Sequence, residues 1–389
     1  MASLESSILV GGVSVAVVGG GIGGLLSSIE IAKLGFNVIV YEEHGAVGLP
    51  KHCTGLISET TLSEIIRSSG INHKNIIKAK FNEYAVMLLT PNKLSMAFNI
   101  KFNEYVYLID RVMTEQLIAQ RAEDLGVNIK LKTIVSDVLI DRSGMYLIKY
   151  IVSRNVKSKM FTHVIIAEGA KRTLSSRLKL CKSIRNCYGM QALIKFSNQH
   201  YFRTPLIIVG SLSKHYFGWI VPVSDDELLV GIMDSNSPIK IYRSLTMFIK
   251  KYLREFINNK DLKVREYFGG LIPCDMRCIL GVRNLCSVGD ASSLIKPFTG
   301  GGIYVITSQV KALTEALRKY QDDVATMYSI KLTPLIKILK RDLIVKKLID
   351  TVGGYRIIVR FLSNFIDTLK VKNYDDMLSS LLRGFSIFT

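Results

Sequence analysis

The chain has 389 residues, of which 48% are hydrophobic and 21% are charged, a composition that excludes a disordered protein. Its formal net charge of +19 favours an anionic partner, either nucleic acid or an anionic membrane surface. The sequence contains no zinc-finger spacing, RNA-binding aromatic motif or helix-turn-helix signal, so nucleic acid is not expected as a partner. The mean hydropathy of +0.26 favours lipid instead, although no apolar run reaches the ~18 residues of a membrane-spanning helix.

A strand–helix–strand unit with a glycine-rich turn begins the chain. Residues 13–18 (VSVAVV) predict a buried parallel strand, and apolar residues at helical spacing follow as far as Gly35. NVIVYEE predicts the next strand. The turn between the first strand and the helix reads GGGIGG. Its glycines, which include a G-x-G-x-x-G pattern, are Gly19, Gly21, Gly23 and Gly24.

This turn predicts a dinucleotide site. Gly19 permits the tight turn, Gly21 lets the backbone approach a pyrophosphate, and Gly24 lets helix and strand pack closely. The helix N-terminus offers free N–H groups and the positive end of its dipole to the phosphates. Glu42 ends the second strand about 20 residues further on, where a carboxylate accepts hydrogen bonds from ribose hydroxyls. The alternative is a glycine-rich turn with a solvated Glu42.

The later elements alternate between strands and helices. We expect an antiparallel pair at 85–90 and 93–100, a helix at 111–125, and strands within 127–140, 145–153 and 160–166. Residues 187–235 are predicted to be rich in strands, 241–259 helical, 285–292 a strand running into a turn, 303–319 helical, and the rest helical and basic.

These elements predict an α/β fold, in which a Rossmann-type dinucleotide-binding domain is interleaved with an antiparallel β-sheet domain for the substrate. The first domain is expected at residues 10–60, 105–180 and 270–320. The second is expected at residues 61–104 and 181–269, and a basic helical C-terminal region at 321–389.

The cysteines and the N-terminus bear on the compartment. MASLESSILVGG has no basic region, so we expect no signal peptide. The six cysteines, Cys53, Cys181, Cys187, Cys274, Cys278 and Cys286, form no C-x-x-C pair. Both observations favour a cytoplasmic chain with mostly reduced thiols. For Cys274 and Cys278 a core or disulfide role is favoured over metal binding, and no metal site is predicted.

A second glycine-rich block, LCSVGDASSLIKPFTGGGI, resembles the second FAD motif of the glutathione-reductase-like flavoproteins. The resemblance implies that Asp290 binds the ribityl or pyrophosphate part of FAD. It also implies that backbone N–H groups at a helix N-terminus hold the flavin end, namely those of Gly300, Gly301, Gly302 and Ile303. Arg111, at the start of a helix, and Val135, beside the adenine, fall where this class of flavoprotein places cofactor contacts.

Two further segments resemble the geranylgeranyl reductase family. Pro50-Lys51-His52-Cys53-Thr54-Gly55 is similar to that family's P-x-x-C-G loop, which reaches the flavin ring. FGWIVP is similar to its Y-x-W-x-F-P motif, with Phe217 in place of the Tyr, Val221 in place of the Phe, and Trp219 and Pro222 matching. The resemblance implies that Lys51, Cys53 and Thr54 contact FAD and that Phe217, Trp219 and Pro222 line a prenyl tunnel.

The family resemblance implies reduction of isolated C=C bonds in polyprenyl chains. Reduced flavin supplies a hydride to one alkene carbon, and the other carbon needs a proton from Cys53, from His52 or from water. The alternative for Cys53 is an inert buried thiol. Ferredoxin or NAD(P)H is the expected electron donor.

A flavin-dependent hydroxylase of an aromatic or quinone substrate is the alternative enzyme, and a non-catalytic flavin-binding relative is a further one. Hydroxylases carry a D-G-x-x-S motif. This chain has Glu168-Gly169 and, where the Ser would fall, Arg172, which weakens the hydroxylase interpretation. A solvated Arg172 is the simpler alternative.

The C-terminal region predicts a basic amphipathic helix. An apolar stripe, Leu332, Leu335, Ile336, Leu339 and Leu343, lies opposite Lys337, Lys340 and Arg341. Such a helix suits an anionic membrane surface, which implies a peripheral position on the inner membrane face. The alternative is a helix that packs its apolar stripe on the protein body and exposes its lysines.

Overall fold

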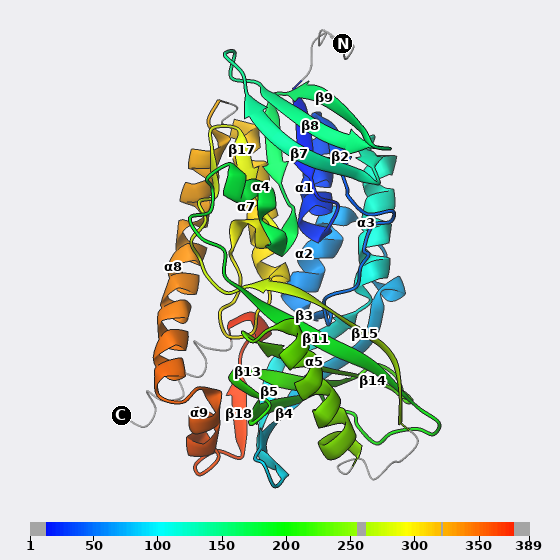
Figure 1. The fold of residues 1–389 in the computed structure, drawn as a ribbon, viewed down its shortest axis with the longest axis vertical. Helices are drawn as coiled ribbons and strands as arrows, with labels where there is room; N and C mark the ends of the chain where they lie inside the picture. The colour runs from blue at the N-terminus through cyan, green and yellow to red at the C-terminus, as the bar shows by residue number, and fades with distance from the viewer. Residues whose placement is uncertain (1–12, 255–261, 320–321, 377–389) are drawn as a thin grey trace.

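The computed structural model describes residues 13–254, 262–319 and 322–376, so the N-terminal sequence assessed above lies outside the described residues. A six-stranded sheet lies at one end of the molecule and a nine-stranded sheet at the other (Figure 1). A three-stranded sheet covers one face of the six-stranded sheet, and helices cover the other. This arrangement confirms the predicted α/β fold with a Rossmann-type nucleotide-binding layer.

The six-stranded sheet has the order β16-β17-β10-β1-β2-β6. Its strands are β1 (Ser14–Val18), β2 (Asn37–Tyr41), β6 (Asn128–Lys130), β10 (His163–Ile166), β16 (Gly281–Val282) and β17 (Leu285–Ser287). All neighbouring strands are parallel except β16 and β17. Val15 and Val17 of β1 pack toward the helices, and Ala16 and Val18 pack toward the three-stranded sheet, so the apolar run VSVAVV is buried on both faces.

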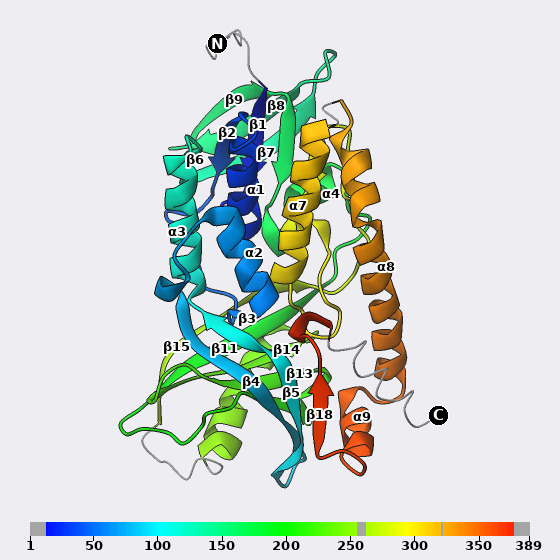
Figure 2. The same ribbon diagram turned by 180° about the vertical axis from the view of Figure 1, so that it is seen from behind.

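The helices on one side of this sheet are α1 (Ile22–Ala32), α2 (Glu59–Ser69), α3 (Arg111–Asp124) and α7 (Ile303–Lys319). The sequence predicts α1, α3 and α7, whereas it predicts no helix at α2. The three-stranded sheet consists of β7 (Thr133–Ile140), β8 (Tyr146–Val152) and β9 (Asn155–Phe161). Figure 2 shows α1, α2, α3 and α7 side by side on the helical face.

The nine-stranded sheet has the order β15-β11-β14-β13-β12-β4-β5-β18, and β3 also pairs with β5. Its strands are β3 (Leu56–Ser58), β4 (Ile77–Leu89), β5 (Leu94–Ile109), β11 (Asn186–Phe196), β12 (Leu206–Gly210), β13 (Ser213–Pro222), β14 (Glu227–Asp234), β15 (Leu262–Pro273) and β18 (Thr368–Val371). Helix α5 (Pro238–Met247), with the π-helical turn Phe248–Leu253, packs on one face. The division into domains at the boundaries given above stays a prediction.

The C-terminal region differs from the helical segment that the sequence predicts. Helices α8 (Val324–Thr351) and α9 (Tyr355–Leu362) are followed by strand β18 and the 3-10 turn η5 (Tyr374–Asp376). Strand β18 pairs in parallel with β5, from Thr368 opposite Asn99 to Val371 opposite Phe102. A strand of four residues whose partner lies more than 260 positions earlier leaves no local pattern that would separate it from a short helix.

The apolar stripe of the predicted amphipathic helix packs on the protein body. Leu332 and Leu339 are 3% and 2% exposed in the core beneath the helices, and Leu335 and Ile336 pack against that core. Burial of these side chains favours the alternative interpretation, in which this face of α8 is not a membrane surface. No helix in the described part of the chain combines the length and the apolar character that a membrane crossing needs.

The expectation of mostly reduced thiols is wrong, because disulfides join Cys181 to Cys278 and Cys187 to Cys274. The disulfide role predicted for Cys274 and Cys278 is thereby confirmed. Cys286 is a free, buried thiol. The paired cysteines are 97 and 87 positions apart in the sequence, so their spacing gave no indication that they meet.

Candidate active site

The glycine-rich turn forms an open cradle at the start of α1. Gly19 has a φ of 110°, and its N–H donates to the carbonyl oxygen of Tyr41 over 2.8 Å. A Cβ atom at Gly24 would lie 2.0 Å from the carbonyl oxygen of Gly19, so only glycine allows this helix–strand approach. A Cβ atom at Gly21 would meet no described atom within 4 Å, and no side chain caps the helix there. The space at Gly21 beside this helix start is therefore open, although the N–H of Ile22 is bound by Glu115.

Glu42 lies beside this cradle at the end of β2, and it is only 7% exposed. Its Oε2 atom accepts the N–H of Gly20 over 2.6 Å, and its Oε1 atom accepts the N–H of His44 over 2.8 Å. These bonds fix the carboxylate against the turn. Its Oε1 atom also lies 2.6 Å from Nδ1 of His44, so Oε2 is the oxygen that keeps a lone pair for a further donor. The solvated Glu42 of the simpler interpretation is not observed.

Arg111 begins α3 on the same side of the sheet as the cradle. Its guanidinium pairs with Glu115, whose Oε1 atom also accepts the N–H of Ile22 at the start of α1 over 3.0 Å. Burial opposes the charge of Arg111, but Glu115, Cys53 and Asp290 together raise its pKa. The Nε atom of Arg111 is buried and has no hydrogen-bond partner among the described residues. A buried, charged donor with an unused N–H suits an anionic ligand.

The second glycine-rich block forms the 3-10 turn η4 (Gly289–Ser292), which ends in Ser293, and the start of α7. A Cβ atom at Gly302 would lie 3.0 Å from Oδ1 of Asp290, so the two ends of the block lie against each other. Removal from water raises the pKa of Asp290, while His52, Arg111 and Arg172 oppose this shift. Residues from the second FAD block, from the cysteine loop and from the start of α3 therefore lie within electrostatic reach of one another.

The cysteine loop leads into β3. Cys53 is a half-buried, free thiol that packs against the core beneath the helices. His52 is exposed, and its Nδ1 atom lies 3.1 Å from the carbonyl oxygen of Pro50. Lys51 is also exposed and pairs with Glu266 of β15 over 2.8 Å. Of the three reactive side chains, Cys53 is the one that faces the interior, and the cofactor contact of Lys51 stays a prediction.

Gln191 connects the cysteine loop to the tryptophan segment, and sequence reasoning missed it. This side chain is 1% exposed on β11. Its Oε1 atom accepts from the Thr54 hydroxyl over 3.0 Å and from Nε1 of Trp219 over 3.3 Å. Its Nε2 atom donates to the carbonyl oxygen of His52 over 3.4 Å. One polar residue within the otherwise apolar run MQALI was the available signal, because a buried amide needs partners.

Phe217 and Trp219 lie on the same face of β13, with ring centres 6.0 Å apart. A Cβ atom at Gly231 on the neighbouring strand would lie 2.3 Å from the Trp219 ring, so glycine makes the space that the indole fills. Pro222 is buried at the end of β13. Val135, on β7, is 9% exposed and packs with Tyr41 in the core on the opposite face of the six-stranded sheet.

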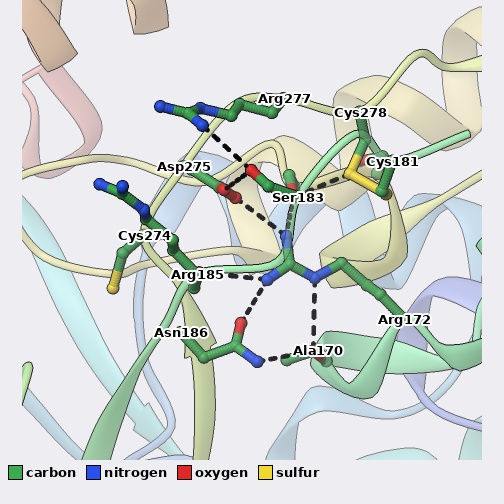
Figure 3. A network of polar contacts seen from close by, with 12 residues as sticks. Ala170, Arg172, Cys181, Ser183, Arg185, Asn186, Cys274, Asp275, Arg277 and Cys278 are labelled. Atoms are coloured by element: carbon green, nitrogen blue, oxygen red, sulfur yellow. Dashed lines mark hydrogen bonds and ion pairs between the residues drawn. A yellow bond between two sulfur atoms is a disulfide. The ribbon is translucent and has the colours of Figure 1, made fainter. Parts of the chain in front are cut away.

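Arg172 is fully buried, which contradicts the solvated side chain of the simpler alternative (Figure 3). It pairs with Asp275 over 3.1 Å, donates to the carbonyl oxygen of Arg185 over 3.1 Å, and contacts Ser293 and Asn186. Five donors and a fixed planar shape make arginine suited to such a site. The sequence could not reveal that Arg172 lies beside η4, because the partners of its guanidinium named here are 13 to 121 positions away in the sequence.

The two disulfides frame this Arg172 network. The chain passes from the six-stranded to the nine-stranded sheet between β10 and β11, and it returns between β15 and β16. The Cys181–Cys278 disulfide and the Arg172–Asp275 pair join these two connections (Figure 3), and the second disulfide joins Cys274 of the returning connection to Cys187 at the start of β11. The connections therefore form one cross-linked unit beside the second FAD block.

Comparison with known proteins identifies the glycine-rich half of the site. An FAD-binding domain family matches residues 12–177. The chain is 26% identical over 303 residues to digeranylgeranylglycerophospholipid reductase 2 of Methanosphaera stadtmanae, covering 74% of this chain and 73% of that protein. It is 22% identical over 358 residues to digeranylgeranylglycerophospholipid reductase 2 of Methanothermobacter thermautotrophicus, covering 87% and 88%.

Solved structures show the same fold. A geranylgeranyl bacteriochlorophyll reductase-like protein of Thermoplasma acidophilum superposes with a TM-score of 0.80 at 17% identity, over 97% of this chain and 96% of that one. The p-nitrophenol 4-monooxygenase of Pseudomonas putida superposes with a TM-score of 0.67 at 16% identity, over 90% and 97%. Reductases and monooxygenases thus share this fold, which by itself does not separate them.

The residues present fit FAD. Three features suit such a ligand: the open space at Gly21, the buried carboxylate of Glu42 beside the glycine-rich turn, and the buried Nε atom of Arg111, which has no partner among the described residues. FAD is the cofactor, and the contacts assigned to individual residues stay predictions.

The two inner glycines of the cradle should respond differently to alanine. Gly24→Ala places a methyl group 2.0 Å from a carbonyl oxygen and should lower the thermal midpoint sharply. Gly21→Ala should leave the apo-protein's midpoint unchanged but weaken FAD binding at least tenfold, because its methyl group occupies the space of the pyrophosphate. Thermal unfolding and flavin fluorescence measure the two effects. Wild-type FAD affinity in Gly21→Ala would contradict the assignment.

The Arg172 network should be a major source of stability. Asp275→Leu leaves a buried guanidinium without its counter-ion and should cost about 3–5 kcal/mol in the free energy of unfolding. Arg277→Gln is the matched control, because Arg277 is exposed on the same segment and its guanidinium donates to the Ser183 hydroxyl over 3.2 Å. Its effect should stay within about 0.5 kcal/mol. Urea unfolding measures the free energy of unfolding of both variants. Equal losses in Asp275→Leu and Arg277→Gln would contradict a special contribution of the Arg172–Asp275 pair to stability.

Proposed function

The chain belongs to the FAD-dependent oxidoreductases, and on that premise we propose that it reduces isolated C=C bonds in the polyprenyl chains of a membrane lipid. The observation that carries the proposal is the connection made by Gln191, which joins the cysteine loop to Trp219. The two segments that resemble the geranylgeranyl reductases thereby act as one unit. The names of the similar digeranylgeranylglycerophospholipid reductases support this substrate class.

FAD, when bound and reduced, supplies the hydride for the alkene. The chain has to exclude water, align the alkene and provide a proton for the second carbon. We assign the proton to the Cys53 thiol, which is free, half-buried and within electrostatic reach of Arg111. The other free thiol, Cys286, is fully buried, and burial raises its pKa strongly. His52 and water remain the alternative proton sources.

The tunnel for the prenyl chain is proposed along β13. Phe217 contacts Trp219 on one side and lies 6.3 Å, between ring centres, from Tyr355 of α9 on the other. Met233 and Ile272 pack in the same cluster, and both approach Gly300 of the second FAD block. An alkene has no polar group to hold, so aromatic and aliphatic walls that fix its position are the expected means of alignment.

The hydroxylase alternative is less well supported. Arg172 occupies the place of the hydroxylase serine, and its guanidinium is committed to Asp275, Ser293 and Asn186. A residue held in this way is not free to contact a nicotinamide donor. The electron donor is proposed to be ferredoxin or NAD(P)H, and the net charge of +19 suits an acidic protein partner.

Anaerobic turnover with a geranylgeranyl lipid tests the proposal. After reduction of the bound flavin by dithionite, the lipid should gain two hydrogens for each bond reduced, as measured by mass spectrometry. Cys53→Ala should lower the rate per bound flavin by about 10²-fold or more, the usual effect of losing a general acid. Cys286→Ala should leave that rate unchanged.

Unchanged lipid mass with reduced flavin bound would reject the reductase proposal. Oxygen consumption that depends on NADPH and an aromatic substrate would favour the hydroxylase instead. A wild-type rate in Cys53→Ala, with a loss of rate in His52→Ala, would move the proton to His52.

Access to a membrane lipid also needs a docking surface, which we place at the end of α8 and on α9. This α8–α9 surface carries apolar side chains that are 51–65% exposed: Ile344, Leu348, Val352, Ile357, Phe361 and Phe365. The first three are four positions apart at the end of α8, and the last three are four positions apart along α9 and the turn after it, so they form two stripes. Lys347, Arg356 and Arg360 are exposed beside them. Apolar stripes flanked by cations suit an anionic lipid surface, and α9 packs directly behind Phe217.

Vesicle sedimentation tests this surface. The protein should bind vesicles that contain anionic lipid, bind zwitterionic vesicles weakly, and lose binding as salt rises. Phe361→Asp should weaken binding about tenfold or more, since a buried Phe contributes about 1.5–3 kcal/mol. Val156→Asp is the control, because Val156 is 67% exposed on the distant three-stranded sheet. Equal binding by Phe361→Asp and Val156→Asp would reject the surface, and self-association through it would appear in sedimentation without vesicles.

A further inference from the structure

The segment that follows β18 reaches back to the centre of the molecule. Figure 2 shows η5 between the two large sheets, close to the start of α7. There the Tyr374 ring contacts Tyr84 and Phe102 edge-on, and its N–H donates to Glu104 over 2.8 Å. Burial, then Asp375, raises the pKa of Tyr374, and Cys53 adds to the shift. The last described residues of the chain therefore lie within electrostatic reach of the proposed proton donor.

Asp375 joins the second FAD block to β3 and α2, the elements that follow the cysteine loop. Its Oδ1 atom accepts from Nζ of Lys296, over 2.7 Å, in the second FAD block. Its Oδ2 atom accepts from the Thr61 hydroxyl over 3.0 Å and from the Ser58 hydroxyl, directly after the cysteine loop. The side chains of Lys296 and Asp375 are 13% and 7% exposed, so this ion pair is largely removed from water.

Lys296 is held against the glycines expected to face the flavin. Its N–H donates to the carbonyl oxygen of Gly301 over 3.1 Å, and its carbonyl oxygen accepts the N–H of Gly300 over 2.9 Å. A Cβ atom at Gly301 would lie 2.8 Å from Cε of Lys296 and 3.5 Å from its Nζ atom. The Nζ atom also lies 4.7 Å from the centre of the Tyr374 ring. The ammonium group is therefore fixed beside the glycine loop rather than free in solvent.

A charge beside a flavin alters its electronics, because reduction adds electron density to the ring. A cation favours the electron-rich reduced form and a carboxylate disfavours it. At low exposure these effects are weakly screened by water and salt. The balance between Lys296 and Asp375 consequently acts on the reduced flavin more than a surface pair would.

We propose that the Lys296–Asp375 pair sets the reduction potential of the bound flavin, so that the C-terminal segment 368–376 is part of the active site. Both side chains are positioning residues that act on the cofactor through charge. The proposal rests on FAD as the cofactor and does not depend on the identity of the lipid, because the potential is measured without substrate.

Reduction potentials of the holoenzyme, measured against a reference dye without lipid, test the proposal. Lys296→Met leaves the Asp375 carboxylate uncompensated and should lower the reduction potential of the bound flavin. The expected shift is about 30 mV for two electrons, which is a tenfold change in the ratio of oxidised to reduced flavin. Asp375→Asn leaves the ammonium uncompensated and should raise the potential by a similar factor. The double variant should return close to the wild-type value, and Lys296→Arg should retain it.

Lys331 and Glu315 provide the matched control pair. They form a 2.6 Å ion pair between α8 and α7, away from the glycine loop. Lys331→Met and Glu315→Gln should leave the potential unchanged. Opposite shifts for the two Lys296–Asp375 variants support the proposal. Shifts in the same direction, or lowered thermal midpoints with an unchanged potential, would overturn it and leave the pair with a purely structural role.

Discussion

The buried guanidinium of Arg172 is the constraint on which the rest of the structure depends. Two of the connections between the six-stranded and nine-stranded sheets, β10 to β11 and β15 to β16, meet at this one side chain. Its contact with Ser293 ties the same point to the second FAD block. A charge removed from water is tolerable only when its partners are in place. The position of one sheet against the other is therefore linked to the conformation of the cofactor loop, and the disulfides on either side restrict that junction further.

A second polar contact performs a comparable role closer to the chemistry. Gln191 holds the cysteine loop against the strand that carries Trp219, and its own side chain is 1% exposed. Buried hydrogen bonds of this kind specify one arrangement, because an alternative packing would leave the amide unsatisfied. The distance between the thiol and the aromatic wall is thus fixed by the protein and not by the substrate. Such pre-organisation suits a substrate that offers no polar group of its own.

Local patterns made much of the nucleotide-binding half predictable. Gly24 is needed for its close approach to Gly19, five positions earlier, so this part of the glycine spacing carries the fold directly. The cofactor and the α/β class followed from that pattern and its second block. By contrast, Arg172, Gln191 and Asp375 have partners up to 121, 139 and 317 positions away, respectively, and no spacing encodes such contacts. The paired cysteines and strand β18 escaped prediction for the same reason: both are defined by pairing across the fold.

The parallel pairing of β18 with β5 also determines how late in synthesis the nine-stranded sheet can be completed. Strand β5 ends before residue 110, yet its edge at Asn99–Phe102 is covered by residues 368–371, while β3 pairs with β5 at Val106–Leu108. An uncovered strand edge can pair with other chains. During synthesis from the N-terminus, that edge and the ion pair of Lys296 stay incomplete until residues 368–376 have emerged. Removal of residues 368–376 would therefore uncover this edge and take away the partner of Lys296, even though these residues lie far from every glycine-rich motif in the sequence.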